Sequence, residues 1–184
     1  MRKQTKLVAV LSTAALLAIG ASMTSFAATG WAEEDGTWVY YNRDGERATD
    51  QWKKSGNNWY WLNSDGEMAI DELIQDGDNY YYVDINGVMA ANQWVAIDNE
   101  DAGQDDEPDH YWYYFQANGK ALKNGDNAKV ALKTVNGKKY AFDDEGRMLF
   151  GWVAADNAER IDNADGDGFK EGDYYFGGED DGAM

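Results

Sequence analysis

A repeat of about 21 residues constrains this chain more than any other feature of its sequence. Trp52, Leu73 and Trp94 follow one another at this interval, and the aromatic runs that begin at Trp59 and Tyr80 have the same spacing. Self-similarity at a fixed period of this length is typical of repeat architectures. The sequence therefore predicts a stack of similar units instead of one globular core.

Six such units can be aligned on an aromatic run and on the glycine that follows it. The runs are residues 38–41, 59–62, 80–83, 112–115, 139–142 and 174–176. Met184 falls at the position of Met68, Met89 and Met148, which is the middle of a unit. We therefore expect residues 28–184 to form one repeat array whose last unit is incomplete, as part of a longer protein.

Each unit reads locally as a short β-hairpin followed by a connecting loop. Runs of aromatic and β-branched residues bounded by Gly, Asn and Asp are typical of strands. Asn-Gly and Asp-Gly pairs supply the positive φ angles of tight hairpin turns. On this basis we expect the turns at Asp44-Gly45, Asp65-Gly66, Asn86-Gly87, Asn118-Gly119 and Glu145-Gly146. One hairpin is marginally stable in water, so the fold class predicted is an all-β solenoid of stacked β-hairpins.

The two faces of these strands differ, because side chains alternate along a strand. One face is apolar or aromatic in all six units and is predicted to be a structural spine: Val39/Tyr41, Tyr60/Leu62, Tyr81/Val83, Tyr113/Phe115, Tyr140/Phe142 and Tyr174/Phe176. The other face is aromatic in four units, but it begins with Lys139 in the fifth and Asp173 in the sixth. An aromatic face that folding does not need in every unit indicates ligand contact.

Residues 1–27 have the pattern of a helical secretory signal peptide. Arg2, Lys3 and Lys6 precede an apolar run from Leu7 to Ala21, and small residues at 25 and 27 predict cleavage after Ala27. The apolar run is too short for a comfortable membrane span. We therefore expect a secreted protein with no stable membrane span after cleavage.

The composition argues against nucleic acid as a partner and against stabilisation by disulfides. Removing three basic residues with the signal leaves 13 Lys and Arg against 34 Asp and Glu, a net charge of −21. Such a chain repels phosphate backbones, so nucleic acid is not an expected partner, and it attracts cations. Cysteine is absent, so no disulfide stabilises the array.

The repeated pattern resembles the cell-wall-binding repeats of Gram-positive bacteria, which include choline-binding and glucan-binding modules. The pattern is Gly-Trp, a spacer, Trp/Tyr-Tyr-Tyr, a turn glycine and Met, and it covers residues 30–184. The resemblance implies a hairpin solenoid at the cell wall or cell surface. It also implies a wall polymer as partner, either choline-bearing teichoic acid or a glycan.

In the choline-binding members, aromatic residues of neighbouring hairpins hold the quaternary ammonium by cation–π contacts. Carried over to this sequence, the resemblance pairs each opening tryptophan with the first aromatic residue of the same unit, and an aromatic residue of the next unit completes the cage. The candidate binding residues are Trp31, Trp38, Trp52, Trp59, Trp61, Tyr80, Tyr82, Trp94, Trp112 and Tyr114, with Met68 and Met89 as cage floors. Leu73 and Lys139 depart from the pattern and weaken the sites to which they would belong.

No metal site, cofactor or enzyme activity is predicted. Asn163, Asp165 and Asp167 match the first half of a calcium loop, but Tyr174 replaces the glutamate that such a loop needs at its twelfth position. His110 is the only histidine, and a Ser-His-Asp arrangement lacks a suitable serine. Two alternatives to wall binding stay open: a structural or adhesive array without small-ligand sites, and the targeting segment of a wall hydrolase whose catalytic domain is not in this chain.

Overall fold

The computed structural model describes residues 29–104, 107–126, 129–161 and 168–184, and these residues form strands and no helix. The predicted signal peptide and most of the candidate calcium loop lie outside the described residues. The strands are β1 (Gly30–Glu34), β2 (Thr37–Tyr41), β3 (Gln51–Ser55), β4 (Asn58–Leu62), β5 (Glu72–Asp76), β6 (Asn79–Val83), β7 (Gln93–Asp98), β8 (His110–Phe115), β9 (Lys133–Val135), β10 (Lys138–Tyr140), β11 (Gly151–Val153) and β12 (Tyr174–Phe176).

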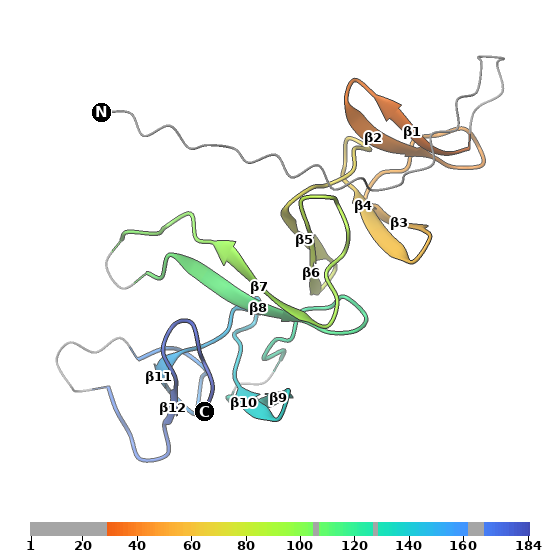
Figure 1. Ribbon diagram of the computed structural model, residues 1–184. Coiled ribbons are helices and arrows are strands. Elements are labelled where there is room, and N and C mark those ends of the chain that lie inside the picture. The colour runs from red at the N-terminus through yellow and green to blue at the C-terminus, as the bar shows by residue number, and fades with distance from the viewer. Residues whose placement is uncertain (1–28, 105–106, 127–128, 162–167) are drawn as a thin grey trace, which may run out of the picture.

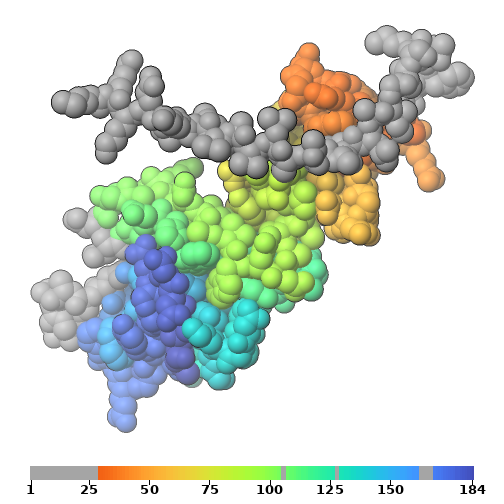
Figure 2. Space-filling model, viewed as in Figure 1, coloured from red at the N-terminus to blue at the C-terminus, as the bar shows by residue number. Residues whose placement is uncertain are grey.

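Consecutive strands pair as antiparallel hairpins, six in the part of the chain described. In Figure 1 the hairpins follow one another in sequence order, from β1–β2 at one end of an elongated body to β11–β12 at the other. The space-filling view shows the same succession of colours along the body (Figure 2). The predicted fold class, a solenoid of stacked hairpins, is confirmed for these residues.

The turns that close the hairpins are not the predicted ones. The first hairpin turns at Asp35-Gly36, with φ angles of 51° and 83°, and the others with two-residue loops turn at Gly56-Asn57, Gly77-Asp78 and Asn136-Gly137. The predicted pairs lie in the connecting loops, where Gly66 N–H donates to the carbonyl of Asn63 (2.9 Å). Each unit holds two Gly-containing turn signals, and the prediction assigned the hairpin to the second of them.

Main-chain hydrogen bonds join each unit to the next at a constant position. The amide of Met68 in the second unit donates to the carbonyl of Trp38 in the first, at 2.8 Å. The same bond recurs from Met89 to Trp59, Ala121 to Tyr80, Met148 to Trp112 and Met184 to Lys139. These bonds fix the methionine position of one unit beside the first aromatic residue of the preceding unit.

The glycine of each connecting loop lies against the methionine position of the preceding unit. Gly87 has a φ of 74°, and a Cβ atom there would lie 3.0 Å from both the Ala69 carbonyl oxygen and Met68 Cε. Gly119 and Gly182 meet Met89 and Met148 in the same way. Glycine is therefore needed here both for the backbone conformation and for the close approach of two units.

The core is divided into five small clusters along the stack. The cluster between the first two units contains Ala48, Tyr60, Leu62 and Met68, and Trp31 packs against it. The predicted spine face is buried in every unit, except that Tyr41, Tyr81 and Tyr174 are partly exposed. This division is expected of repeat proteins, in which each unit buries its apolar face against its neighbours. Among the described residues, no helix is long and apolar enough to span a membrane.

Candidate functional site

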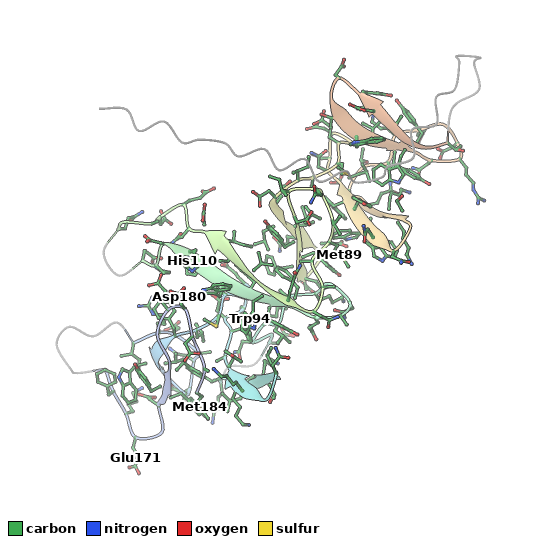
Figure 3. The ribbon with its side chains drawn as sticks, viewed as in Figure 1. Met89, Trp94, His110, Glu171, Asp180 and Met184 are labelled. Carbon is green, nitrogen blue, oxygen red and sulfur yellow. The ribbon has the colours of Figure 1, made fainter. Side chains whose placement is uncertain are left out.

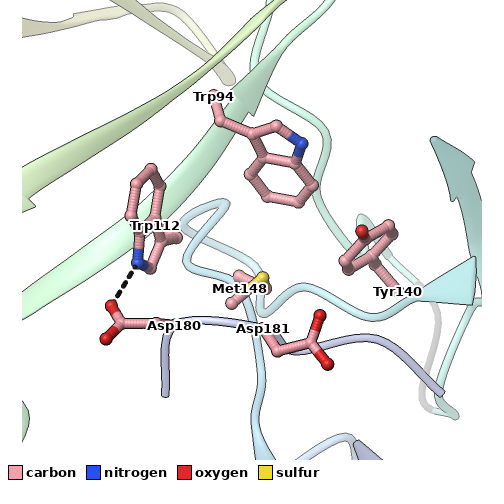
Figure 4. A pocket seen from close by; sticks show the side chains of 6 residues that line it. All are labelled: Trp94, Trp112, Tyr140, Met148, Asp180 and Asp181. Atoms are coloured by element: carbon pink, nitrogen blue, oxygen red, sulfur yellow. Dashed lines mark hydrogen bonds between the residues drawn. The ribbon is translucent and has the colours of Figure 1, made fainter. Parts of the chain in front are cut away.

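Two cavities in the stack are lined by residues from equivalent repeat positions. The cavity between the first and second units is lined by Trp31, Trp38, Tyr60 and Met68. The cavity between the fourth and fifth units is lined by Trp94, Trp112, Tyr140, Met148, Asp180 and Asp181 (Figure 4). The first four residues of each set occupy the same positions in their units, so the two cavities are built in the same way.

The hairpin geometry explains why two tryptophans of one unit meet. Directly opposed residues of an antiparallel pair share a face, and Trp31 opposes Tyr40 while Glu33 opposes Trp38. Trp31 and Glu33 are two positions apart and also share a face. Trp31 and Trp38 therefore lie on one face of the first hairpin, and the equivalent register brings Trp94 and Trp112 together in the fourth.

The next unit supplies the other two walls. The Trp31 ring centroid is 5.3 Å from that of Tyr60, at an angle of 73° between the ring planes. The corresponding pair, Trp94 and Tyr140, is at 4.9 Å and 59°. The stacking bonds of Met68 and Met148 place the methionine beside the tryptophan that begins the preceding aromatic run. Each cavity therefore exists only where two successive units are stacked.

The two cavities differ in size and in charge. The Trp94 cavity encloses about 240 Å³, whereas the Trp31 cavity leaves no room for a water-sized group, so its side chains must move apart before a ligand can enter. Carboxylates line only the larger of these two. Three aromatic faces and a polarisable sulfur suit an organic cation, because the negative faces of aromatic rings attract positive charge.

Asp180, at the rim of the larger cavity, contacts two side chains of the fourth unit. The Trp112 indole N–H donates to Asp180 Oδ1 at 3.1 Å, and His110 Nε2 lies 3.1 Å from the same oxygen. The hydrogen bond from Trp112, followed by that from His110, lowers the pKa of Asp180, because both stabilise the carboxylate. Asp180 is therefore a carboxylate at neutral pH.

The predicted pair Trp52 and Trp59 has the same repeat positions but lines neither cavity. The Trp52 ring centroid is 5.0 Å from that of Tyr81, and the Met89 amide donates to the Trp59 carbonyl. Trp59 is 40% exposed, and Lys54 Nζ lies 5.8 Å from the centroid of its ring. A cation of the protein itself therefore already faces this tryptophan.

Three other predicted binding residues also lie outside both cavities. Trp61 is buried and its ring is 5.2 Å from that of Trp52, and Tyr114 contacts Trp94 at 5.2 Å in the same way. Tyr82 stacks on Phe115 and donates its hydroxyl to Asp71. In these three units the third aromatic residue of the run packs against the opening residue or the core.

The junction of the third and fourth units lacks two of the four residue types. Leu73 stands where the other cavities have an opening tryptophan, and Ala121 stands where they have methionine. Tyr80, a predicted binding residue, packs in the cluster around Ala90 and Phe115. This junction is filled by apolar packing.

Five residues that line the cavities were not among the predicted binding residues. Tyr60 and Tyr140 were assigned to the structural spine. The buried face of a unit also packs against the preceding unit, so these two tyrosines form walls of the cavities there. Met148 was recognised as an equivalent of Met68 without being given a role. Asp180 and Asp181 lie in a loop that is longer than its counterparts, which was the signal available for them in the sequence.

Comparisons with known proteins agree with this arrangement. Residues 48–94 match the choline-binding repeat family, and residues 111–121 match the cell wall binding repeat. None of the curated proteins searched matches the chain. Among solved structures, the choline binding domain of Spr1274 of Streptococcus pneumoniae is 33% identical over 52% of this chain and 95% of that domain, with a TM-score of 0.38.

Two further structures from Streptococcus pneumoniae share the fold over most of the chain. CbpJ is 26% identical over 85% of this chain and 42% of its own length, with a TM-score of 0.52. Choline binding protein F, solved in the presence of a peptidoglycan analogue, is 23% identical over 85% of this chain and 41% of its own, also with a TM-score of 0.52. The chain thus spans less than half the length of these two proteins.

A stack of β-hairpins with aromatic cavities between units defines a cell-wall-binding repeat module. The chain belongs to the family of proteins with choline-binding repeats, as the family matches and the identity to the Spr1274 domain show.

Proposed function

We propose that this chain is a non-catalytic binding module that attaches a secreted protein to the bacterial cell wall. Its ligands are wall polymers bearing quaternary ammonium groups, such as choline on teichoic acid, and the ammonium groups enter the aromatic cavities between hairpins. The observation that carries this proposal is the repeated quartet of two tryptophans, a tyrosine and a methionine. The same four residue types occur at three junctions, those of Trp31, Trp52 and Trp94, and two of the three enclose a cavity lined by all four.

The chemistry of the cavities supports a cation as ligand. A cation over an aromatic face gains about 0.5–2 kcal/mol, depending on how far it is desolvated. The Trp31 indole N–H is buried without a hydrogen-bond partner in the protein, so it is free to donate to a hydroxyl-bearing ligand if the smaller cavity opens. Within the described ranges no cluster of metal-ligating side chains occurs, and His110 contacts Asp180 and the Trp112 ring.

Choline titration of residues 28–184, followed by tryptophan fluorescence and thermal melting, tests the proposal. We expect a saturable fluorescence change and a rise in melting temperature. Trp112→Ala should weaken the response at the larger cavity at least tenfold, since it removes one of the three aromatic walls. Trp152→Ala is the matched control, because Trp152 is 44% exposed and lines neither cavity.

Two other results would change the proposed ligand or the proposed function. A response to purified wall polysaccharide but not to choline would retain wall binding and discard the quaternary ammonium. No response of the folded chain to either ligand would favour the alternative of a structural or adhesive array, in which the tryptophans only stack. Packing of Trp52 between Trp61 and Tyr81 shows that the fold does use some tryptophans in this way.

A further inference from the structure

The connecting loop of the sixth unit differs in length from the others. Gly182 follows the end of its strand at Phe176 by six positions, whereas Gly66 and Gly87 follow Leu62 and Val83 by four. The loops that end at Gly119 and Gly146 also have the shorter length. The sixth loop therefore contains two additional residues, and it carries Glu179, Asp180 and Asp181.

This longer loop reaches past its immediate neighbour in the stack. Asp180 Oδ1 accepts the indole N–H of Trp112 and lies 3.1 Å from His110 Nε2, so the sixth unit contacts the fourth. Asp181 Oδ1 is 3.3 Å from Lys138 Nζ of the fifth unit. In Figure 4 the two aspartates lie across the cavity from Trp94. The cavity between units four and five therefore has a rim supplied by unit six.

The Trp31 cavity provides an internal comparison. The loop that covers Met68 there is the short loop of the third unit, and no carboxylate is among the residues lining the cavity. The same aromatic and sulfur walls thus occur once with two carboxylates and once without. Lys138 offsets part of the charge of Asp181, while the groups that contact Asp180 at its Oδ1 are an indole and an imidazole.

We propose that Asp180 and Asp181 are specificity-determining residues, which make the Trp94 cavity charge-selective for small alkylammonium ions. The proposal deepens the function above and rests on cation binding in the cavities. Carboxylates at the rim attract a cation by a Coulomb interaction that a neutral ligand of the same shape does not have. The attraction is screened by salt, because both side chains are largely exposed. The two cavities of one chain therefore differ in ligand preference.

The test uses choline and its neutral isostere, 3,3-dimethylbutan-1-ol, with the other aromatic sites disabled. Trp31→Leu and Trp52→Leu isolate the Trp94 cavity, and leucine is compatible with this position because Leu73 occupies it in the third unit. Binding is measured by the shift of the Trp112 indole N–H resonance at low and high NaCl concentration. Asp180→Asn with Asp181→Asn removes the charge and retains oxygen acceptors for Trp112. Glu171→Gln is the control, since Glu171 is in the same unit but far from Asp180 (Figure 3).

We expect each aspartate substitution to weaken choline binding by about two- to fivefold, the range of exposed ion pairs. Binding of the neutral isostere should stay unchanged, and the salt dependence of choline binding should decrease in the double variant. Glu171→Gln should bind as the parent does. Equal choline affinity and equal salt dependence with and without the aspartates would overturn the charge selectivity while leaving choline binding intact.

A second measurement needs no aspartate substitution. The ratio of choline affinity to isostere affinity is compared between the chain with only the Trp94 cavity and a chain in which Trp52→Leu and Trp94→Leu leave the Trp31 cavity, whose binding is followed by the Trp31 indole N–H resonance. A higher ratio at the Trp94 cavity supports the proposal, and an equal ratio overturns it. Absence of choline binding at both cavities would overturn the proposed function and this inference with it.

Discussion

At the scale of single residues, each repeat position has a defined structural role, and that role explains the residue type found there. The main-chain carbonyl of the first residue in an aromatic run accepts a hydrogen bond from the next unit. The second residue of the run lies at the interface with the preceding unit. Tyr60 shows how one residue combines two tasks, because it is buried in a core cluster and also forms a cavity wall.

Gly87→Ala should destabilise the protein much more than Gly77→Ala. Both glycines have positive φ, which costs a residue with a Cβ about 1–2 kcal/mol. At Gly77 a Cβ meets nothing within 4 Å, whereas at Gly87 it meets Met68 and the Ala69 carbonyl. Overpacking adds about 1–3 kcal/mol to the Gly87 variant. Urea unfolding of both variants measures the difference, and equal losses would show that the two units are not in close contact there.

The contact of Asp180 with Trp112 should be lost in acid. Because the folded pKa of Asp180 is lowered, the carboxylate stabilises the docked loop above the ordinary aspartate pKa of about 3.9, and this stabilisation is lost as the pH falls through the folded pKa. The groups facing it are His110 and Trp112, with Asp181 and Lys138 on the same rim. The Trp112 indole N–H resonance should therefore shift below about pH 4.

Asp180→Asn is the control for this titration, since it cannot lose a carboxylate proton. Its Trp112 resonance should show no such shift over the same range. A shift of the same size in both proteins would assign the acid transition to another group.

At the scale of the element, each unit consists of a hairpin and a connecting loop with its own hydrogen bonds. Asn63 Oδ1 accepts the amides of Asp65 and Glu67 at 3.0 Å each. Asp84 and Asp143 do the same in the third and fifth units. These side chains hold the loop that carries the turn glycine into contact with the preceding unit.

Asn63→Ala should therefore destabilise the second unit by about 1–2 kcal/mol, because two amides lose their acceptor. Asn63→Asp should be close to neutral, since aspartate performs this task in two other units. Thermal and urea unfolding of the two variants give the comparison. If both lost the same stability, the side-chain NH₂ of Asn63, and not its oxygen, would be the important group.

Much of each element could be predicted from the sequence, and the failures have physical reasons. The strand runs and the buried face followed from alternation and period, and Phe115 and Phe142 are fully buried as expected. The hairpin turns were misplaced because Asp35-Gly36 and Asp44-Gly45 give the same local signal. Alternation also identifies which residues share a face, but it does not show what that face contacts in the next unit. For this reason Tyr140 was not recognised as a cavity wall.

At the scale of the whole molecule, the core is divided into five clusters, so a substitution in one cluster should affect stability and binding mainly at the neighbouring junctions. Leu62 is fully buried in the cluster below the Trp31 cavity, so Leu62→Ala should cost about 2–5 kcal/mol and disrupt that cavity. Two further junctions separate the Trp94 cavity from it, and repeat proteins transmit such effects mainly between neighbours. We expect choline to shift the Trp112 indole resonance of this variant as in the parent. If choline no longer shifted the Trp112 resonance in this variant, the array would instead behave as a single cooperative unit.

The constant bonds between units have a consequence for attachment under the proposed function. They hold the two cavities at a fixed separation, so a polymer chain with many ammonium groups that occupies one cavity presents further groups to the other at a high effective concentration. Avidity then exceeds the affinity of either cavity alone, and residence time on the wall depends on how many cavities are engaged together. Free choline, by competing at each cavity separately, would release the protein from the wall over a narrow range of concentration.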